Sequence, residues 1–566
     1  MLSDQRTPLG VITHGSLEGG LQMKLDRAES VEDVTNGSLV VVGGARYDFF
    51  AMVKDVRIEA ANEEILLHPP AAENDLLRKV MRGQGTYATL DLQPMLMAPQ
   101  GGDAEHDEPQ SVKTIPSHFS TVSLASEDDV ARIFGAEANT DEDGRQRFFE
   151  IGQPREMEDL PVCLDLKKFV ERSNAVFGKT GTGKSFLTRL LLCGLIQSGR
   201  AVNLVFDMHG EYGMGTNKET DAADGGEHVP GLKKLFRSKV SIFSLDPKAT
   251  RERSGQSPDF PVYLYADQVQ PSDILLLQDT LNLNDTAADS CYALQNRHGE
   301  RWLLELLDTD DDEIDTLADS VGAHTGSMKA LKRKFGRLMQ EDFFRAESSD
   351  DKQDVTQALM ACIEDGTSVV FEFGGHKDIS TYLLVANIIT RQIRAEYETK
   401  ANTYARTQKP ADKPQQLMIT IEEAHKFLTP TIARETSFGK IAREMRKYFV
   451  SLLVVDQRPS AIDDEVLSQI GTKIVAQLSD DKDLSAALVG TRDSAALRQI
   501  LASLDSKQQA LLMGHAPPMP MAIKTRTYGP DFFEALRAGG PGNGLSGAPQ
   551  DDAAMDAEMD EFFGRG

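Results

Sequence analysis

The residues from Gly178 to Ser185 have the types and the spacing of a loop that binds phosphate groups. They read Gly-Lys-Thr-Gly-Thr-Gly-Lys-Ser, between the apolar run Asn174 to Phe177 and a helical pattern from Phe186 to Ile196. Glycines permit the tight turn that points successive backbone N–H groups at phosphate oxygens, and the following helix adds the positive end of its dipole. Lys184 would reach the β- and γ-phosphates, and Ser185 would bind Mg²⁺. A chance glycine-rich turn is the alternative. The pattern predicts a site for ATP or GTP with Mg²⁺, formed by Gly178, Lys179, Thr180, Gly181, Thr182, Gly183, Lys184, Ser185 and Phe186.

Two adjacent carboxylates, Glu422 and Glu423, follow another apolar run, Leu417 to Ile421. A phosphate loop that hydrolyses its nucleotide needs one carboxylate that holds Mg²⁺ through water and a second that polarises the attacking water. We assign the metal-side role to Glu422 and the general-base role to Glu423. The alternative is a pair of solvated acids at the start of a helix, a position that the helix dipole favours.

Polar residues also follow two other apolar runs. Asp207 and Glu211 come after Ala201 to Phe206, and Gln457 comes shortly after the run from Phe449 to Val455. We predict that Asp207 and Glu211 help to order the nucleotide site and that Gln457 is a sensor that contacts the γ-phosphate or its water. For Gln457 the alternative is an ordinary strand-end cap.

The predicted helix from Ile441 to Tyr448 carries three cations in five positions, at Arg443, Arg446 and Lys447. A solvated basic face is one explanation. The other is that one of its arginines reaches the nucleotide of an adjacent subunit and stabilises the charge that develops in the transition state. The second explanation would make oligomerisation a condition of catalysis.

Apolar strands that alternate with amphipathic helices must position these groups. From about residue 160 the chain contains seven continuously apolar strands, which is typical of a parallel sheet that is buried on both faces. We therefore predict an α/β fold, a RecA-like phosphate-loop core with a mainly parallel sheet. The predicted strands are 174–177, 201–206, 240–243, 368–373, 417–421, 449–455 and 472–476.

Other parts of the chain have different patterns. Short β-like runs between residues 9 and 97 predict a small antiparallel barrel or sandwich. Helical periodicity without strands predicts an inserted helical subdomain, and the glycine-rich and then acidic end predicts a disordered tail that could be a docking peptide. The predicted domains are a small N-terminal β-barrel with its connector (1–158), the core (159–535), the helical insertion within it (266–366) and the tail (536–566).

The composition is that of a globular protein with more than one domain. The 566 residues are 40% hydrophobic and 26% charged, which excludes collagen-like, mucin-like and wholly disordered chains. No apolar run approaches the roughly 20 residues that cross a bilayer, and no signal peptide is visible, so we expect a cytoplasmic protein without a membrane partner. The net charge of −27 argues against nucleic acid on the outer surface but not against a basic interior channel. The four cysteines lack metal-binding spacing.

The order and spacing of these motifs from about residue 160 to 530 resemble the HerA family of hexameric ATPases, which is related to FtsK-type DNA translocases. The resemblance implies a homo-oligomer, a hexameric ring. It also implies that Arg446 is an arginine finger on the neighbour's nucleotide and that Arg172 is a second arginine near the nucleotide. The residues that carry the resemblance are Gly178 to Ser185, Phe206 to Tyr212, Ile421 to His425, and Arg443 to Ser460.

Three residues depart from the family pattern without removing a catalytic group: Asn174, Met208 and Met445. The resemblance implies ATP hydrolysis that drives translocation along double-stranded DNA in the pore, with a NurA-like nuclease on the N-terminal barrel, in DNA end processing or antiviral defence. The alternative is a ring that mainly serves as an assembly platform for a defence effector, such as a sirtuin-like or nuclease subunit. A third class, the coupling ATPases of type IV secretion, would need a membrane anchor. Candidates for the pore lining are Lys377, Arg434 and Lys440.

Overall fold

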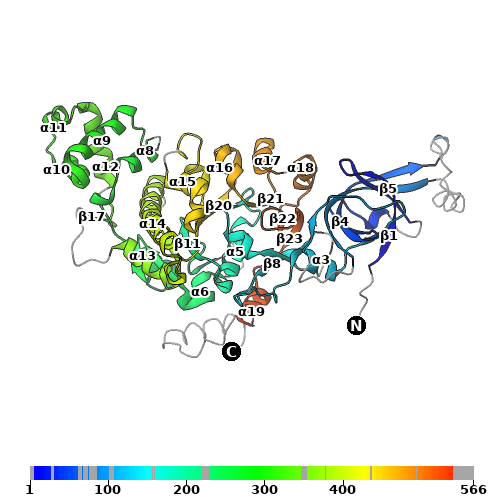
Figure 1. The fold of residues 1–566 in the computed structure, drawn as a ribbon. Helices are drawn as coiled ribbons and strands as arrows, with labels where there is room; N and C mark the ends of the chain where they lie inside the picture. Colours follow the sequence, from blue (N-terminus) through cyan, green and yellow to red (C-terminus); the bar gives the residue numbers. More distant parts are fainter. Residues whose placement is uncertain are drawn as a thin grey trace. The chain divides into compact units, whose positions relative to one another are not determined.

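The computed structural model (Figure 1) describes residues 6–26, 31–61, 67, 74, 86–100, 108–155, 157, 160–217, 228–278, 280–338, 340–345, 354–376, 378–433, 436–491 and 494–538. The chain forms two compact units. Unit 1 comprises Met1–Leu166, Thr472–Leu478 and Thr491–Thr527, and unit 2 comprises Lys167–Gly471, Ser479–Gly490 and Tyr528–Gly566. The domain boundaries predicted from the sequence stay predictions.

An antiparallel barrel forms the N-terminal part of unit 1. Its strands are β1 (Pro8–Ser16), β2 (Gly20–Leu25), β3 (Leu39–Gly43), β4 (Tyr47–Ala60), β5 (Thr86–Pro99) and β7 (Thr121–Leu124), with β6 (Gln110–Ser111) added to β5. Their order is β2-β1-β7-β3-β4-β5, and the pairing of β2 with β5 closes the ring. Alternate side chains, such as Phe49, Ala51 and Val53, fill the interior because neighbours along a strand point to opposite faces. The sequence thus predicted the strands, and the structure decides for a barrel over a sandwich.

A second antiparallel ladder completes unit 1. Its order is β21-β22-β23-β8-β9. The predicted strand 472–476 is β21, and it pairs antiparallel with β22. The elements are α3 (Glu127–Phe134), β8 (Phe148–Pro154), β9 (Val162–Asp165), β21 (Thr472–Ala476), α18 (Ser494–Ala502), β22 (Gln509–Gly514) and β23 (Met521–Thr525).

A parallel sheet forms the centre of unit 2, as the sequence predicted. Its strands are β10 (Asn174–Phe177), β11 (Val202–Asp207), β14 (Val240–Ser244), β15 (Phe260–Pro261), β18 (Ser368–Glu372), β19 (Leu417–Glu422) and β20 (Val450–Asp456). They lie in the order β15-β14-β18-β11-β19-β20-β10, and every pairing is parallel. Every residue of β11, β18, β19 and β20 is buried, which explains their continuous hydrophobicity.

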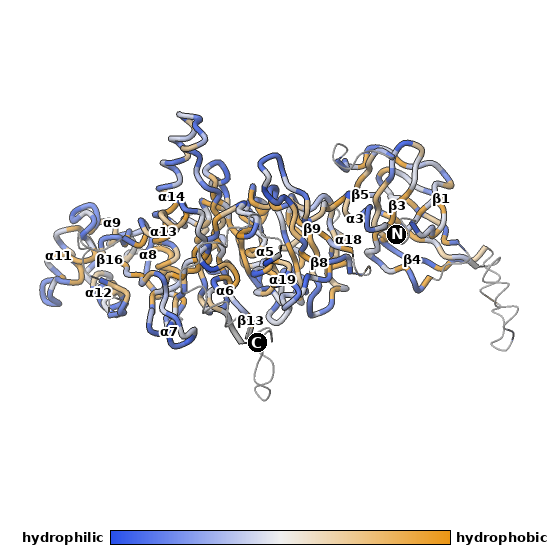
Figure 2. The backbone as a smooth tube through the Cα atoms, turned by 90° about the horizontal axis from the view of Figure 1, so that it is seen from below, coloured by the Kyte–Doolittle hydropathy of each residue, from blue (hydrophilic) through white to orange (hydrophobic). Residues whose placement is uncertain are grey.

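Helices surround this sheet. Helix α5 (Lys184–Ser198) is buried on nearly all sides, and Figure 2 shows segments of hydrophobic residues around it. The long helix α14 (Ile379–Thr407) is buried mainly in its first half. The others are α4 (Leu166–Val170), α6 (Leu232–Phe236), α7 (Pro247–Ser254), α13 (Val355–Glu364), α15 (Ser437–Glu444), α16 (Asp464–Gln469), α17 (Asp481–Ala487) and α19 (Pro530–Ala538), with the strand pair β12 (Gly215–Asn217) and β13 (His228–Pro230).

A helical insertion follows β15, as predicted. It contains α8 (Pro271–Leu276), α9 (Asp285–His298), α10 (Trp302–Asp308), α11 (Ile314–Val321) and α12 (Thr325–Leu338). Trp302 is fully buried and donates from Nε1 to the carbonyl of Val269 at 2.9 Å, so it is a core residue of the insertion. The prediction that this region lacks strands is wrong at one point. The two-residue strand β17 (Phe344–Arg345) lies within the region and pairs with β16 (Leu264–Tyr265), which directly precedes it, and both are too short to show a periodicity.

Some predictions fall at the limits of the described residues. Lys377, Arg434 and the tail residues 539–566 lie outside them, whereas residues 536–538, predicted as the start of the tail, complete helix α19. Within the described ranges, no helix combines the length and the apolar character that crossing a bilayer requires.

Candidate functional site

The predicted phosphate loop joins β10 to α5 in unit 2. Gly181 and Gly183 have φ of 80° and 92°, values in the left-handed region that a residue with a side chain rarely adopts. Helix α5 begins at Lys184, and no described side chain caps its N-terminus. Its first N–H groups therefore remain available to an anion, as a phosphate loop requires.

Lys184 is half-buried at this helix start. Burial lowers the pKa of its ammonium group, and the carboxylates of Glu423, Asp456, Glu422 and Glu211 act in the opposite direction. The ammonium group thus lies among acidic side chains, and a bound phosphate would be a further anion that its positive charge attracts.

Acidic residues end the parallel strands beside the loop. In the strand register Asp207 of β11 lies beside Glu372 of β18 and is the strand-end neighbour of Glu422 on β19. Asp456 of β20 lies beside Phe177, the last residue of β10. Since ligands of parallel sheets bind at the carboxyl ends of the strands, the sheet brings these groups to one edge.

Glu422 is buried, with 8% of the residue exposed. Its Oε1 accepts a hydrogen bond from the Tyr212 hydroxyl at 2.8 Å, while its Oε2 has no partner among the described residues. The pKa of Glu422 is raised to about 8, mainly by burial and also by the charges of Asp207 and Glu211, against the Tyr212 hydrogen bond, which lowers it. A buried carboxylate oxygen without a donor suits a cation or a cation-bound water, so the donor set fits the predicted metal-side role.

Asp207 organises the loop that carries Tyr212. Its carboxylate accepts from the backbone N–H groups of Glu211 and Tyr212, both at 2.8 Å. Burial raises the pKa of Asp207, and these hydrogen bonds lower it. The neighbouring Glu372, which the sequence did not single out, forms an ion pair with Arg253 at 2.6 Å. Asp207 is therefore fully engaged with backbone groups and acts on the site through the loop.

Glu423 lies next to the phosphate loop in an unusual backbone conformation. Its φ of 48° and ψ of 41° place a residue with a side chain in the left-handed region, a strain that often occurs at functional sites. Gln457 connects it to the loop, because Gln457 accepts from the Thr180 hydroxyl at 2.8 Å and its Nε2 approaches Glu423 Oε1 at 3.5 Å. Two predicted site residues and the loop thus form one hydrogen-bonded chain.

His425 and Asp456 hold the turn that follows Glu423. Asp456 accepts from the His425 backbone N–H at 2.6 Å and lies 3.0 Å from His425 Nδ1. It also accepts from the Arg458 backbone N–H at 2.7 Å. Sequence reasoning gave Tyr212, His425 and Asp456 no role, although Asp456 ends an apolar run in the same manner as Asp207.

The two predicted arginines lie at the amino ends of the parallel strands, and the phosphate loop lies at their carboxyl ends. Arg446 precedes β20 and Arg172 precedes β10, whereas Gln457 and the phosphate loop follow these strands. At about 3.3 Å per residue, the seven residues of β20 separate Arg446 from its own chain's site by roughly 20 Å. Both arginines are exposed, and the structure does not bring them to the loop of their own chain.

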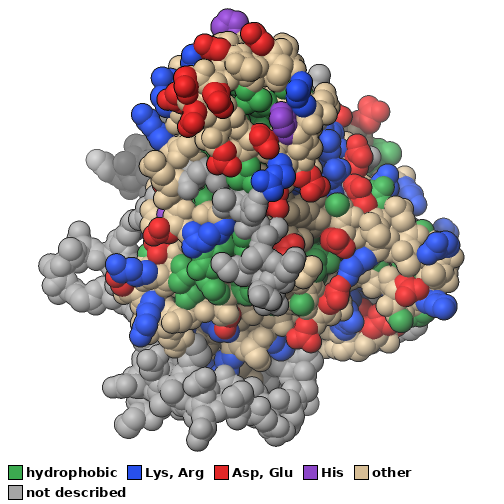
Figure 3. All heavy atoms as spheres, turned by 90° about the vertical axis from the view of Figure 1, so that its left-hand side faces the viewer, with side chains coloured by type: hydrophobic (Ala, Val, Ile, Leu, Met, Phe, Trp, Pro, Cys, Tyr) green, Lys and Arg blue, Asp and Glu red, His purple; other side chains and the backbone are tan. Residues whose placement is uncertain are grey.

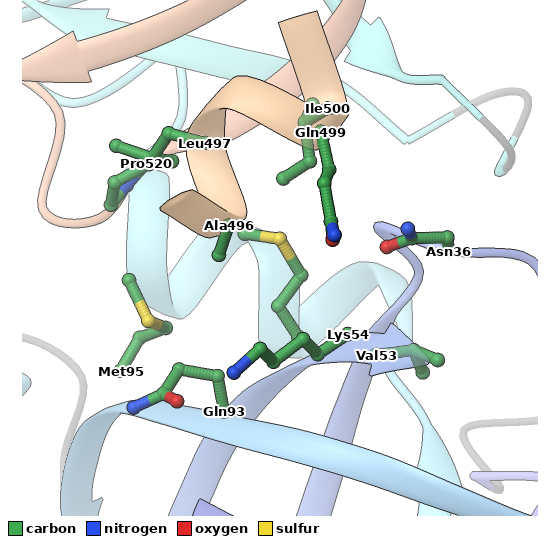
Figure 4. Close-up of a pocket in the computed structure, with 11 residues that line it drawn as sticks. Asn36, Val53, Lys54, Gln93, Met95, Ala496, Leu497, Gln499, Ile500 and Pro520 are labelled. Atoms are coloured by element: carbon green, nitrogen blue, oxygen red, sulfur yellow. The ribbon is translucent and has the colours of Figure 1, made fainter. Parts of the chain in front are cut away.

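A separate small cavity, of about 30 Å³, lies within unit 1, between the barrel and helix α18 (Figure 4). Apolar side chains line most of it, among them Met52 and Val53 from β4, Met95 from β5 and Leu497 from α18, with Lys54 the one charged group. The described lining residues include no carboxylate, histidine or cysteine, so this cavity has no group for acid-base or nucleophilic chemistry.

Comparison with known proteins points to one family. Residues 149–393 match the family described as "Helicase HerA, central domain". The chain is 25% identical over 417 residues to the DNA double-strand break repair helicase HerA of Pyrococcus furiosus, covering 67% of this chain and 69% of that protein. It is 24% identical over 386 residues to the protein of the same name from Sulfolobus acidocaldarius, covering 66% and 68%. A solved structure, VirB4 of Thermoanaerobacter pseudethanolicus, aligns at a TM-score of 0.44 and 14% identity over 68% of this chain and 98% of that one.

Proposed function

Because residues 149–393 match the family model described as "Helicase HerA, central domain", we propose that this chain is a ring-forming ATPase that couples ATP hydrolysis to translocation along double-stranded DNA. A NurA-like partner nuclease, docked on the N-terminal barrel, would process the DNA ends or degrade foreign DNA. The relatives named as DNA double-strand break repair helicases support the DNA-repair role.

The proposed ATPase activity is supported by a series of hydrogen bonds that runs from the phosphate loop to Glu423, the proposed general base. Thr180, Gln457 and Glu423 are connected by hydrogen bonds of 2.8 and 3.5 Å. A group that contacts both the loop and the general base can register the γ-phosphate and orient the attacking water at the same time. An ordinary strand-end cap would not need to bridge these two groups.

Each residue then has a role in hydrolysis. Lys184 holds the β- and γ-phosphates, and the N–H groups of the loop and of the first turn of α5 hold the α- and β-phosphates. Ser185 would hold Mg²⁺ directly and Glu422 would hold it through water, and the bound ion neutralises phosphate charge. Glu423 accepts the proton of the water that attacks the γ-phosphate, and Gln457 keeps that water in line.

The positions of the arginines support a ring. Since Arg446 lies on the opposite edge of the sheet from its own chain's loop, it can stabilise transition-state charge only at a neighbour's nucleotide. A closed ring presents the finger edge of each subunit to the nucleotide edge of the next. Six subunits are the number that the family implies, and Arg172 is the second candidate for the shared interface.

Surface charge bears on what the ring binds. The insertion exposes a group of acids, and acidic side chains are numerous on the upper part of the face in Figure 3. Such a surface repels DNA, which limits DNA to a pore. Lys440, on α15, is half-buried and remains the described candidate for the pore lining. The exposed acids are Glu305, Asp308, Asp310, Asp311, Asp312, Glu313, Asp315 and Asp319.

The exposed acids also agree with the alternative function, an assembly platform. In that function the ring assembles or regulates a sirtuin-like or nuclease effector. An exterior of this kind suits protein docking better than DNA coating. The two functions predict different effects of DNA on the ATPase rate. A translocase should hydrolyse ATP faster when DNA is bound, whereas an assembly platform does not need DNA for hydrolysis.

The test is the ATPase rate of the purified chain with and without linear double-stranded DNA. We expect DNA to stimulate the rate and ATP to drive displacement of a third strand from a triplex-bearing duplex. Glu423→Gln is the matched control, because it should keep nucleotide binding and lose displacement. An ATPase rate that does not change when DNA is added, together with effector activity that is independent of DNA, would favour the assembly-platform function.

A further inference from the structure

Phe186, the residue directly after the Lys184-Ser185 pair, stands out on helix α5. It is 37% exposed, whereas the helix interior from Leu187 to Ile196 is buried throughout. Single exposed apolar side chains are common and need no explanation by themselves. This one lies in the first turn of the helix that receives the phosphates, so its surroundings are informative.

Two buried side chains hold the Phe186 ring in place. The Arg189 guanidinium lies 5.2 Å from the ring centre, and the Tyr528 ring centre lies 6.1 Å away at an interplanar angle of 52°. Arg189 is only 1% exposed, and it also donates to the carbonyl of Glu211 at 2.6 Å. The guanidinium is thus fixed to the loop that carries Tyr212, and the Phe186 ring rests against it.

Tyr528 is itself anchored. Its hydroxyl donates to the carbonyl of Pro230 at 2.9 Å, and its ring packs against Phe533 of α19 in an edge-to-face arrangement with centroids 4.9 Å apart. Aromatic pairs in this geometry stabilise beyond their buried area. The segment from Tyr528 into α19 therefore acts as a brace that keeps one exposed ring at a fixed place beside the phosphate loop.

The orientation of the bound nucleotide determines which of its groups lies beside the Phe186 ring. The γ-phosphate must lie toward Glu423 and Gln457, so the α-phosphate, which carries the ribose and the base, lies toward the first turn of α5. A flat, partly exposed ring that packs against Arg189 and Tyr528 at that turn is a surface on which a nucleobase can stack. Aromatic stacking tolerates every base, because each base has a π-face.

We infer that Phe186, braced by Arg189 and Tyr528, is the stacking platform for the base of the bound nucleotide. This inference rests on the proposed nucleotide site and adds the group that separates a nucleoside triphosphate from a bare polyphosphate. Phe186 contributes base affinity, and the loop contributes phosphate affinity.

The experiment compares two probes, ATP and inorganic triphosphate, in titrations of the full chain with Mg²⁺ present. Phe186→Leu keeps an apolar side chain without a ring and should weaken ATP binding roughly tenfold while leaving triphosphate binding unchanged. Phe186→Tyr keeps the ring and should bind both probes as the wild type does. Tyr528→Leu removes the brace and should shift the ATP-to-triphosphate ratio in the same direction as Phe186→Leu.

Other outcomes have distinct meanings. Equal weakening of both probes by Phe186→Leu, or no weakening of either, would overturn the platform, since the ring would then support the loop or do nothing for the base. A wild-type chain that binds neither probe would contradict the proposed nucleotide site itself.

Discussion

Tyr212→Phe removes one hydroxyl and tests the role of Glu422. The hydroxyl donates to Glu422 Oε1 at 2.8 Å, and Oε2 has no described partner, so the variant leaves this buried carboxylate without a protein donor on either oxygen. A hydrogen bond to a charged group contributes about 1.5–3 kcal/mol. Since 1.36 kcal/mol corresponds to a factor of ten, the misplaced carboxylate should weaken Mg²⁺ by about 10- to 100-fold, the usual effect of losing an orienting partner of a metal ligand.

The assay is the Mg²⁺ concentration that gives half-maximal ATPase rate at saturating ATP. Nucleotide binding measured without Mg²⁺ should not change, because the phosphate loop is intact. Tyr382→Phe is the matched control, since the Tyr382 hydroxyl donates to the backbone carbonyl of Glu422 at 3.2 Å and not to its carboxylate. An unchanged Mg²⁺ requirement in folded Tyr212→Phe would refute the metal-side role of Glu422.

Three further predictions concern the same site. Lys184→Ala should abolish ATP binding or turnover in a binding and rate assay, because no other described group replaces its ammonium at the phosphates. Glu423→Gln should trap bound ATP, measured as unhydrolysed nucleotide that stays with the protein, and continued turnover would mean that another residue is the general base. The third prediction concerns pH: burial raises the pKa of Glu422 from 4.5 to about 8, and the ionised form is needed beside Mg²⁺. The ATPase rate at limiting Mg²⁺ should therefore rise with pH through about 8. Because the folded pKa is the higher one, this group should lower the melting temperature of the nucleotide-free chain as pH rises between 4.5 and 8. A melting temperature that does not fall across that range would contradict the buried protonated form.

Most of the fold follows from patterns in the sequence. The strands 174–177 and 472–476 were predicted with their observed bounds, because a strand buried on both faces leaves a continuous apolar run. Strand order and pairing could not be predicted, because they depend on contacts between distant segments. The antiparallel pairing of β21 with β22 is an example, since β22 has the same apolar character as a parallel strand.

The site was predictable where chemistry depends on spacing. Hydrogen bonds connect the phosphate loop, Gln457 and Glu423, because each ends or follows a strand at one edge of the sheet, and the roles assigned to them stay predictions. The role of Tyr212 could not be predicted, since its hydroxyl reaches Glu422 across 210 residues of chain. The brace on Phe186 was equally hidden, because Tyr528 lies more than 300 residues away in sequence.

ATPase activity in mixed rings tests whether neighbouring subunits share each nucleotide site. The claim is that each site needs Glu423 from one chain and Arg446 from its neighbour. Arg446→Ala and Glu423→Gln subunits should each be inactive alone. Mixed together, they should recover activity, because some interfaces pair an intact Glu423 with an intact Arg446. If the two variants assemble into common rings and no mixing ratio restores hydrolysis, the shared site is contradicted.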